Sequence, residues 1–209
     1  MMTMKIPATL AVRHLRSADP VLAAVIERVG PCRARAYPEA SHFGAILRSI
    51  VYQQLSGSAA ATIHGRVLAL FGGREPAPRA LLRTDDATLR AAGLSGQKTR
   101  YVKDLAAHAA DRRFRMERLH ELDDEAVIAA LTQVKSVGRW TVQMFLMFHL
   151  GRPDVLPELD LGIQKGIQVA YGLRRLPNPK QVMRRGVPWA PYRTVASWYL
   201  WRLLEIPQA

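Results

Sequence analysis

Apolar residues recur three and four positions apart along most of the chain, which is the spacing of one buried face on an α-helix. Polar residues suited to N-caps precede these runs, and glycines follow several of them. No stretch of strand length alternates convincingly between apolar and polar residues. The pattern therefore predicts an all-α chain of about nine or ten helices. The clearest of them fall at 20–29, 42–55, 57–71, 95–110, 124–134, 140–150, 160–171, 178–185 and 190–204.

The segment 72–83 contains two prolines and is predicted to be a surface loop. The other linkers are short, and the chain shows no repeat of fixed period and no low-complexity segment. Residues 1–209 are therefore predicted to form a single unit rather than independent domains.

The net charge of the chain indicates which class of molecule it binds. The chain has 30 Lys and Arg against 17 Asp and Glu, a formal net charge of +13. Such a surplus indicates a polyanion, with nucleic acid as the first candidate. The alternative is an arginine preference typical of a GC-rich genome. Arginine is scattered rather than gathered in a tail, so any binding surface must be assembled by folding.

Other classes of protein are disfavoured. No apolar run reaches the length of about eighteen residues that a membrane span needs. The beginning of the chain lacks the apolar segment of a secretion signal. Cys32 is the one cysteine, which excludes an internal disulfide and a four-cysteine metal or iron–sulfur site. We expect a cytoplasmic protein.

Residues 131–145 read LTQVKSVGRWTVQMF, in which the turn 135–138 joins two helical runs. Gly138 is expected to supply permissive backbone at the end of this turn. Such a turn directs consecutive N–H groups outward just before a helix N-terminus, which suits a phosphate and grips DNA without reading bases. An ordinary helical corner with a glycine cap is the alternative interpretation.

The hairpin resembles that of the helix-hairpin-helix DNA glycosylase superfamily, called HhH-GPD, whose turn reads close to Leu-Pro-Gly-Val-Gly. Lys135 and Ser136 stand where proline and glycine are usual. Serine adopts the left-handed conformation less readily than glycine, whereas Lys135 adds a cation for a phosphate. The resemblance implies that the hairpin binds phosphate through Val134, Lys135, Ser136, Val137, Gly138 and Arg139.

The residue after the hairpin indicates the type of reaction. Relatives that also cut the DNA backbone carry a lysine there, which attacks the sugar and forms a Schiff base. This chain has Trp140 in that place. Indole is not a nucleophile, so the resemblance implies base removal by water without strand cleavage.

Residues 154–167 read DVLPELDLGIQKGI and are similar to the family element F-P-x-D-D-L-G, whose second aspartate is essential. That aspartate falls on Asp160, whereas Leu159 replaces the first, so altered capping is expected there. A carboxylate beneath the sugar would stabilise oxocarbenium charge and orient the attacking water. The alternative is that Asp160 only caps its helix.

The segment 49–60, SIVYQQLSGSAA, resembles the family's Gln-Gln-Leu-Ser turn between two helices. The resemblance implies that Leu55 enters the duplex and fills the gap left by an extruded nucleotide, with Gln53 and Gln54 beside it. The alternative is that Leu55 is the last core residue of its helix.

Aromatic residues cluster near the end of the chain, in WAPYRTVASWYLW at 189–201. This pattern looks like the last helix of AlkA-type DNA-3-methyladenine glycosylases. The resemblance implies a base pocket formed by Trp140, Trp201 and Tyr52, whose rings attract a cationic alkylated purine. Trp189 or Trp198 is expected to be a core residue instead.

The resemblance covers residues 41–204 and implies two helical lobes with an active-site cleft between them. One lobe spans about 36–150, with the hairpin at 131–145, and the other combines 1–35 with 151–209. We expect neither the N-terminal β-domain nor the cluster cysteines that some relatives have.

The implied function is that of a DNA-3-methyladenine glycosylase II type hydrolase in base excision repair. It would flip alkylated bases out of duplex DNA, chiefly 3-methyladenine and 7-methylguanine, with etheno- or 1-methyladenine in an open pocket. A monomer at the bacterial nucleoid, with no cofactor, no certain metal and no membrane partner, is expected. The alternatives are a non-catalytic lesion sensor and a glycosylase for mismatched or oxidised bases.

Overall fold

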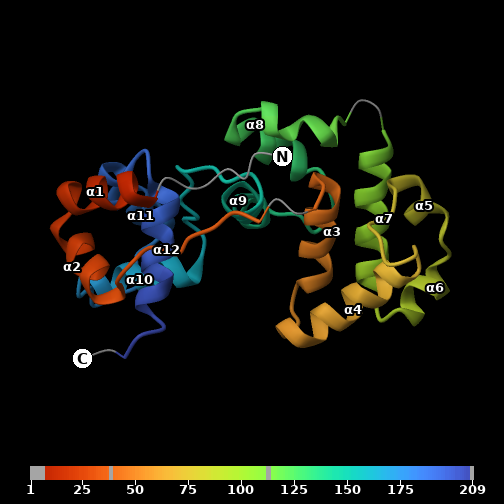
Figure 1. Cartoon of the computed structure of the whole chain (residues 1–209), viewed down its shortest axis with the longest axis horizontal. Helices are drawn as coiled ribbons and strands as arrows, with labels where there is room; N and C mark the ends of the chain where they lie inside the picture. Colours follow the sequence, from red (N-terminus) through yellow and green to blue (C-terminus); the bar gives the residue numbers. More distant parts are fainter. Residues whose placement is uncertain (1–7, 38–39, 112–113, 208–209) are drawn as a thin grey trace. The chain divides into compact units, whose positions relative to one another are not determined.

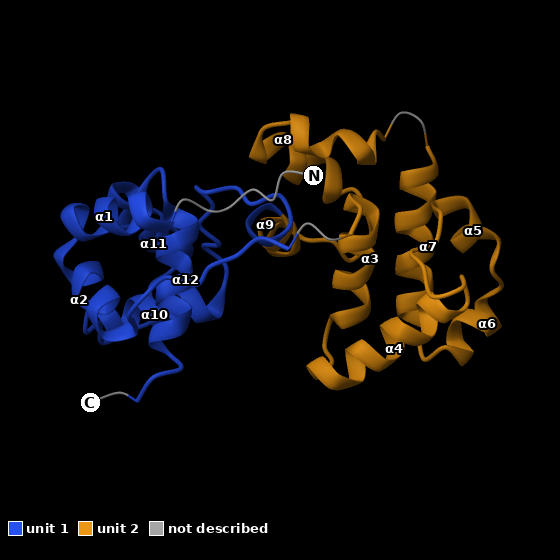
Figure 2. Cartoon of the chain, in the orientation of Figure 1, with its two compact units in different colours: residues 1–37, 146–209 blue, residues 38–145 orange. Residues whose placement is uncertain are grey.

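The computed structural model describes residues 8–37, 40–111 and 114–207. Within these ranges the chain forms twelve α-helices, two short 3-10 helices and no β-strand (Figure 1). The all-α fold class predicted from the sequence is therefore confirmed. The chain divides into two compact units, residues 1–37 with 146–209 (unit 1) and residues 38–145 (unit 2), coloured separately in Figure 2. The lobes expected from the sequence use nearby boundaries; the first seven residues lie outside the described ranges.

Unit 1 is built around its last helix. α12 (Arg193–Leu203) packs against α1 (Ala8–Ala18), α2 (Pro20–Val29) and α10 (Leu161–Ala170), and α11 (Pro179–Arg185) and the 3-10 helix η2 (Val187–Trp189) complete the unit. Trp189 and Tyr199 are fully buried, so the expectation of a core role for Trp189 is confirmed. Asp19 caps α2 and accepts hydrogen bonds from the Trp189 indole, at 2.8 Å, and from the Tyr171 hydroxyl. The buried carboxylate of Asp19 therefore links the beginning of α2 to Tyr171 and to Trp189 of η2.

Unit 2 is organised around a long central helix. α7 (Gly96–Ala110) packs against α3 (His42–Tyr52), α5 (Pro78–Arg83) and α6 (Asp86–Ala91), while α4 (Gly57–Ala69) packs against α3. The 3-10 helix η1 (Met116–Glu121) also contacts α3. α8 (Asp124–Leu131) and α9 (Arg139–Phe148) form the hairpin, and the chain passes from unit 2 to unit 1 within α9.

One sequence-based expectation about the elements was wrong, and one helix had not been predicted. The predicted loop 72–83 ends in α5, because Pro78 occupies the first helical position, where proline starts a helix rather than breaks it. Leu81 of that helix is fully buried. The helix α1 was not predicted; Ala11 and Leu15 are its buried residues.

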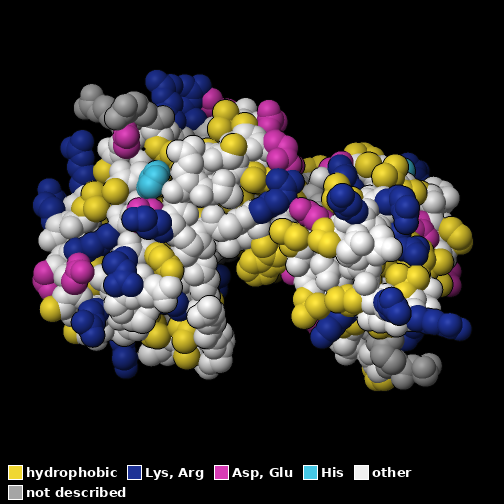
Figure 3. Space-filling view, turned by 180° about the vertical axis from the view of Figure 1, so that it is seen from behind, with side chains coloured by type: hydrophobic (Ala, Val, Ile, Leu, Met, Phe, Trp, Pro, Cys, Tyr) yellow, Lys and Arg dark blue, Asp and Glu magenta, His cyan; other side chains and the backbone are white. Residues whose placement is uncertain are grey.

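Lysine and arginine side chains are spread over both units on the face drawn in Figure 3, with fewer acidic side chains among them. This distribution agrees with the sequence, in which basic residues are scattered. None of the helices in the described part of the chain is long and apolar enough to cross a membrane.

Candidate DNA-binding and catalytic site

The hairpin between α8 and α9 has a tight turn of defined geometry. The N–H of Val134 donates to Leu131 O at 3.1 Å, and the N–H of Val137 donates to Val134 O at 3.1 Å. Both valines are buried, with 1% and 3% of their surface exposed. Their side chains therefore hold the turn in the core, and only the main chain of these positions can meet a ligand. α9 begins next to this turn, which puts the positive end of its dipole there.

Ser136, rather than Gly138, takes the left-handed conformation in this turn. The φ angle of Ser136 is 69°, and Gly138 is not among the described residues with positive φ. The expectation that Gly138 supplies the permissive backbone was therefore wrong. The buried Oγ of Ser136 has no hydrogen-bond partner in the described ranges. The turn forms despite serine replacing the usual glycine, at a cost in backbone strain.

Replacing Ser136 by glycine is expected to stabilise the protein. The change removes left-handed strain and an unsatisfied hydroxyl, and the greater entropy of glycine in the unfolded chain offsets part of the gain. We expect the free energy of unfolding to rise by about 0.5–1 kcal/mol, measured by urea denaturation. Ser136→Ala is the control, because it removes the hydroxyl and keeps the Cβ. An equal gain in both variants would show that strain is not the cause.

The charged side chains of the hairpin already have partners within unit 2. Lys135 donates its backbone N–H to Asp104 Oδ2 at 2.8 Å, and its Nζ lies 3.6 Å from Asp104 Oδ1 while 71% of its side chain is exposed. Arg139 holds Glu125 with two hydrogen bonds of 2.7 and 3.0 Å. This ion pair braces α8 against α9. Lys135 keeps enough exposure to reach a phosphate, whereas the guanidinium of Arg139 is committed to Glu125.

The turn between α3 and α4 presents the residues expected to enter DNA. Gln54 has a φ of 58°, and Leu55 is 40% exposed beyond the end of α3. Leu55 is therefore not the last core residue of its helix. Gln53 differs from its neighbours, because its Nε2 donates to Ser136 O in the hairpin at 3.0 Å. That hydrogen bond joins the two segments that were predicted to contact DNA.

Lys98 supports this turn from α7 and was missed in the sequence. Its Nζ donates to Val51 O at 2.6 Å and to Gln53 O at 2.7 Å, so a cation caps the C-terminus of α3. Ser95 caps α7 and accepts the N–H of Lys98, which sets the start of that helix. Burial lowers the pKa of Lys98. No local pattern signals this role, since the partners lie more than forty residues away in the chain.

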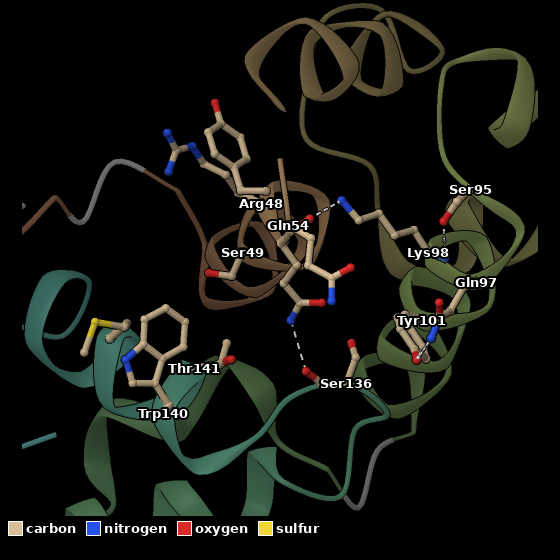
Figure 4. Close-up of a pocket in the computed structure, with 13 residues that line it drawn as sticks. Arg48, Ser49, Gln54, Ser95, Gln97, Lys98, Tyr101, Ser136, Trp140 and Thr141 are labelled. Carbon is tan, nitrogen blue, oxygen red and sulfur yellow. Dashed lines mark hydrogen bonds between the residues drawn. The ribbon is translucent and has the colours of Figure 1, made fainter. Parts of the chain in front are cut away.

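A cavity of about 630 Å³ lies among these elements of unit 2. Figure 4 shows Lys98, Ser136 and Trp140 reaching it from three different segments. Trp140 is 44% exposed, and Tyr52 lies under the Arg48 guanidinium at 4.1 Å. The cavity thus combines predicted site residues with residues that were not predicted. Its lining consists of Arg48, Ser49, Tyr52, Gln53, Gln54, Ser95, Gln97, Lys98, Tyr101, Ser136, Trp140, Thr141 and Met144.

Replacing Lys98 by methionine is expected to destabilise the protein by about 1–2 kcal/mol, since two carbonyls lose a charged donor. Lys103→Met is the matched control on the same helix. Lys103 pairs with exposed Asp86, and such surface pairs contribute only about 0–1 kcal/mol. Urea denaturation of both variants tests the role of Lys98. Equal losses would contradict the capping role.

Asp160 is the N-cap of α10 in unit 1. Its Oδ1 accepts the N–H of Ile163 at 2.8 Å and the indole Nε1–H of Trp201 at 2.9 Å. Gly162 makes this arrangement possible, because a Cβ there would lie 2.8 Å from Trp201 Cδ1 and 2.9 Å from Asp160 Oδ1. The capping alternative is thus realised, but the carboxylate is also held by an aromatic ring. Helix capping alone does not require that second bond.

The loop that delivers Asp160 is fixed by an ion pair that the sequence did not reveal. Arg193 donates from Nε to Asp154 Oδ1 and from Nη2 to Oδ2, both at 2.7 Å. Burial raises the pKa of Asp154, but the hydrogen bonds from Arg193 outweigh burial and leave that pKa below its usual value. Thr194 adds a bond from Val155 N–H to its Oγ1 at 3.0 Å. Leu159 stands in place of the family's first aspartate and is 53% exposed. The N-cap of α10 is Asp160 itself.

The predicted base-pocket residues do not all line one cavity. Tyr52 and Trp140 line the cavity of unit 2, whereas Trp201 lines a second cavity in unit 1 and contacts the Phe148 ring at a centroid distance of 6.0 Å. No group of histidine, cysteine and acidic residues suited to a metal ion occurs in the ranges that the structure describes.

Comparison with known proteins gives consistent matches. The model of the HhH-GPD superfamily of base excision DNA repair proteins matches residues 47–191. The alkylbase DNA glycosidase-like protein mag2 of Schizosaccharomyces pombe is 30% identical over 94% of this chain and 93% of its own.

Two solved structures are also similar. A DNA-3-methyladenine glycosidase from Bacillus halodurans has a TM-score of 0.83 and 37% identity, covering 96% of this chain and 91% of that one. The Schizosaccharomyces pombe 3-methyladenine DNA glycosylase Mag1, in complex with abasic DNA, has a TM-score of 0.79 and 32% identity. That match covers 94% of this chain and 97% of the other.

Proposed function

Because the chain belongs to the HhH-GPD superfamily of base excision DNA repair proteins, we propose that it is a monofunctional DNA glycosylase for alkylated bases. It acts as a monomer on duplex DNA, in a bacterial cell at the nucleoid, and hydrolyses the N-glycosidic bond. The single observation that carries the proposal is the placement of Asp160 under a hydrogen bond from Trp201. The relatives named for 3-methyladenine excision support the choice of substrate.

Asp160 carries the chemistry. As the C1′–N bond breaks, its electron pair leaves with the base, and positive charge develops on the sugar. A fixed carboxylate stabilises that charge. The oxygen of a water molecule then bonds to C1′, and the proton it loses passes to the carboxylate or to solvent. Because Oδ1 is anchored by two donors, Asp160 keeps one orientation throughout.

One carboxylate is sufficient when alkylation of the base has already weakened the glycosidic bond. 3-Methyladenine and 7-methylguanine are cationic as nucleotides and leave as neutral bases, so no general acid is needed. Trp140, which is 44% exposed, supplies an electron-rich ring for such a base, worth about 1–2 kcal/mol in a dry site. The Arg48 guanidinium covers one face of the Tyr52 ring, so Tyr52 has only its other face for stacking on the base.

DNA is held by the hairpin and opened by the turn after α3. The main chain at Val134–Arg139 meets a phosphate, and Lys135 adds a cation. Leu55 and Gln54 enter the duplex, where the leucine replaces the extruded nucleotide and offsets a few kcal/mol of unstacking. Gln53 positions this turn through its bond to Ser136 rather than contacting DNA with its amide nitrogen.

A panel of duplexes, each with one defined lesion, tests the proposal. Free bases are separated by chromatography after incubation with the protein, and release of 3-methyladenine and 7-methylguanine is expected. Release of etheno- or 1-methyladenine would indicate an open pocket. Binding without release would instead support a lesion sensor. Release of 8-oxoguanine alone would support the branch for oxidised bases.

A further inference from the structure

The segment that follows α2 has an alternating pattern. Residues 31–37 form no helix; Pro31, Arg33, Arg35 and Tyr37 are exposed, whereas the residues between them are half-buried. Cys32 and Ala34 pack against the core of unit 1. Extended backbone places alternate side chains on opposite faces, so the basic and aromatic residues share the outer face. The N–H of Tyr37 donates to Phe148 O at 2.6 Å and fixes the end of the segment.

This outer face forms one wall of the second cavity, with a volume of about 600 Å³. α12 contributes Trp198, Trp201 and Arg202 to the lining, and Phe148 also lines the cavity. Tyr37 is 61% exposed. We call this space the 31–37 cavity. It is defined by Val29, Pro31, Arg33, Arg35, Tyr37, Phe148, Trp198, Trp201, Arg202, Glu205 and Ile206.

The positive charge of the 31–37 cavity is only partly neutralised. Arg202 pairs with Glu205 at 2.6 Å, and Glu205 is the one acidic residue in the lining. Neither Arg33 nor Arg35 forms an ion pair with the described residues, and the buried Nε of Arg202 has no hydrogen-bond partner among them. Because Arg33 and Arg35 have no acidic partner in the described ranges, their guanidinium groups beside aromatic rings repel a cationic purine. The cavity is therefore unsuited to a positively charged alkylated base.

An anion next to a flat ring system fits this lining. Guanidinium groups bind phosphate through paired donors, and exposed aromatic rings stack on bases or pack on sugars. We propose that the 31–37 cavity binds a nucleotide of the DNA strand, with Arg33 and Arg35 on its phosphate and Tyr37 against its base. Trp201 lines the cavity and also donates to Asp160, so this nucleotide lies close to the one that is hydrolysed. The inference rests on the proposed function for its choice of DNA.

The test compares two double variants with the same loss of charge. Arg33→Gln with Arg35→Gln removes the proposed contacts, and Arg13→Gln with Arg16→Gln removes two exposed arginines of α1 outside the cavity. Affinity for a labelled duplex with an abasic-site analogue is measured between about 50 and 200 mM salt. We expect the first pair to weaken binding roughly ten-fold and to make the salt dependence shallower by about one to two ions. The second pair should change affinity less than about two-fold.

Two further variants separate the phosphate from the ring. Arg33→Lys with Arg35→Lys should retain the salt dependence, because the charge is kept. Tyr37→Leu should weaken binding roughly five-fold without altering the salt dependence, since stacking releases no counterions. Circular dichroism checks that each variant is folded. A salt dependence equal to that of the α1 control overturns the proposal.

The outcomes also separate this inference from the proposed function. If the Arg33→Gln, Arg35→Gln variant releases base normally and its DNA binding has an unchanged salt dependence, the proposed nucleotide site is wrong and the proposed glycosylase function stands. If the wild-type protein releases no base but the same variant shows a shallower salt dependence of DNA binding, the nucleotide site stands and the proposed glycosylase function is wrong. A third outcome concerns a free nucleotide. If deoxyadenosine monophosphate quenches the tryptophan fluorescence of the wild type while the arginine changes leave DNA affinity unaffected, the assignment to the DNA strand is overturned.

Discussion

Asp160→Asn is expected to lower base release about 1,000-fold while leaving the fold intact. Asparagine caps helices as well as aspartate does, and its Oδ1 can still accept from Ile163 and Trp201. The variant therefore removes the negative charge and little else. Without that charge the developing oxocarbenium ion loses about 4 kcal/mol of stabilisation. DNA affinity should be unchanged or higher, because a charge that repels phosphate is gone.

Single-turnover base release from methylated duplex measures this effect, with unfolding in urea measured beside it. Asp160→Ala is the matched comparison, since it loses the cap as well and should unfold about 1 kcal/mol more easily. If aspartate served only as a cap, asparagine would release base at the wild-type rate and alanine alone would be impaired. That result would remove the catalytic assignment.

Gly162→Ala is expected to lower base release by about 10- to 100-fold. The new Cβ would lie 2.8 Å from Trp201 Cδ1 and 2.9 Å from both Trp201 Nε1 and Asp160 Oδ1, so the indole and the carboxylate must move apart. Small displacements of a catalytic group cost large factors in rate. The hydrogen bond between the two side chains should be lost as well.

A double-mutant cycle identifies the cause. Trp201→Phe keeps a ring and removes the N–H donor, so adding it to Gly162→Ala should lower the rate little further if both act through the same bond. Gly65→Ala is the control, because an added Cβ there meets nothing within 4 Å. It should leave base release unchanged and raise the free energy of unfolding by about 0.5–1 kcal/mol. Fully additive losses in the cycle would place the defect elsewhere.

Local chemistry accounts for what was predictable. The helical spacing of apolar residues predicted the all-α fold, and the motifs around Gly138 and Asp160 predicted the family; both predictions are confirmed. These signals are short-range, since a helix buries one face and a turn depends on its own residues. The roles of the individual site residues stay predictions.

The sequence by itself determined that this chain is helical, basic and built around a hairpin of its family. Only the tertiary structure decided how the site is supported: Lys98 under the turn of Leu55, Arg193 on the loop of Asp160, and Gly162 beneath the Trp201 indole. The reason is physical. Each of these contacts joins residues from different segments of the chain, and their meeting depends on how the core packs. The structure also placed the left-handed residue of the hairpin at Ser136 instead of Gly138.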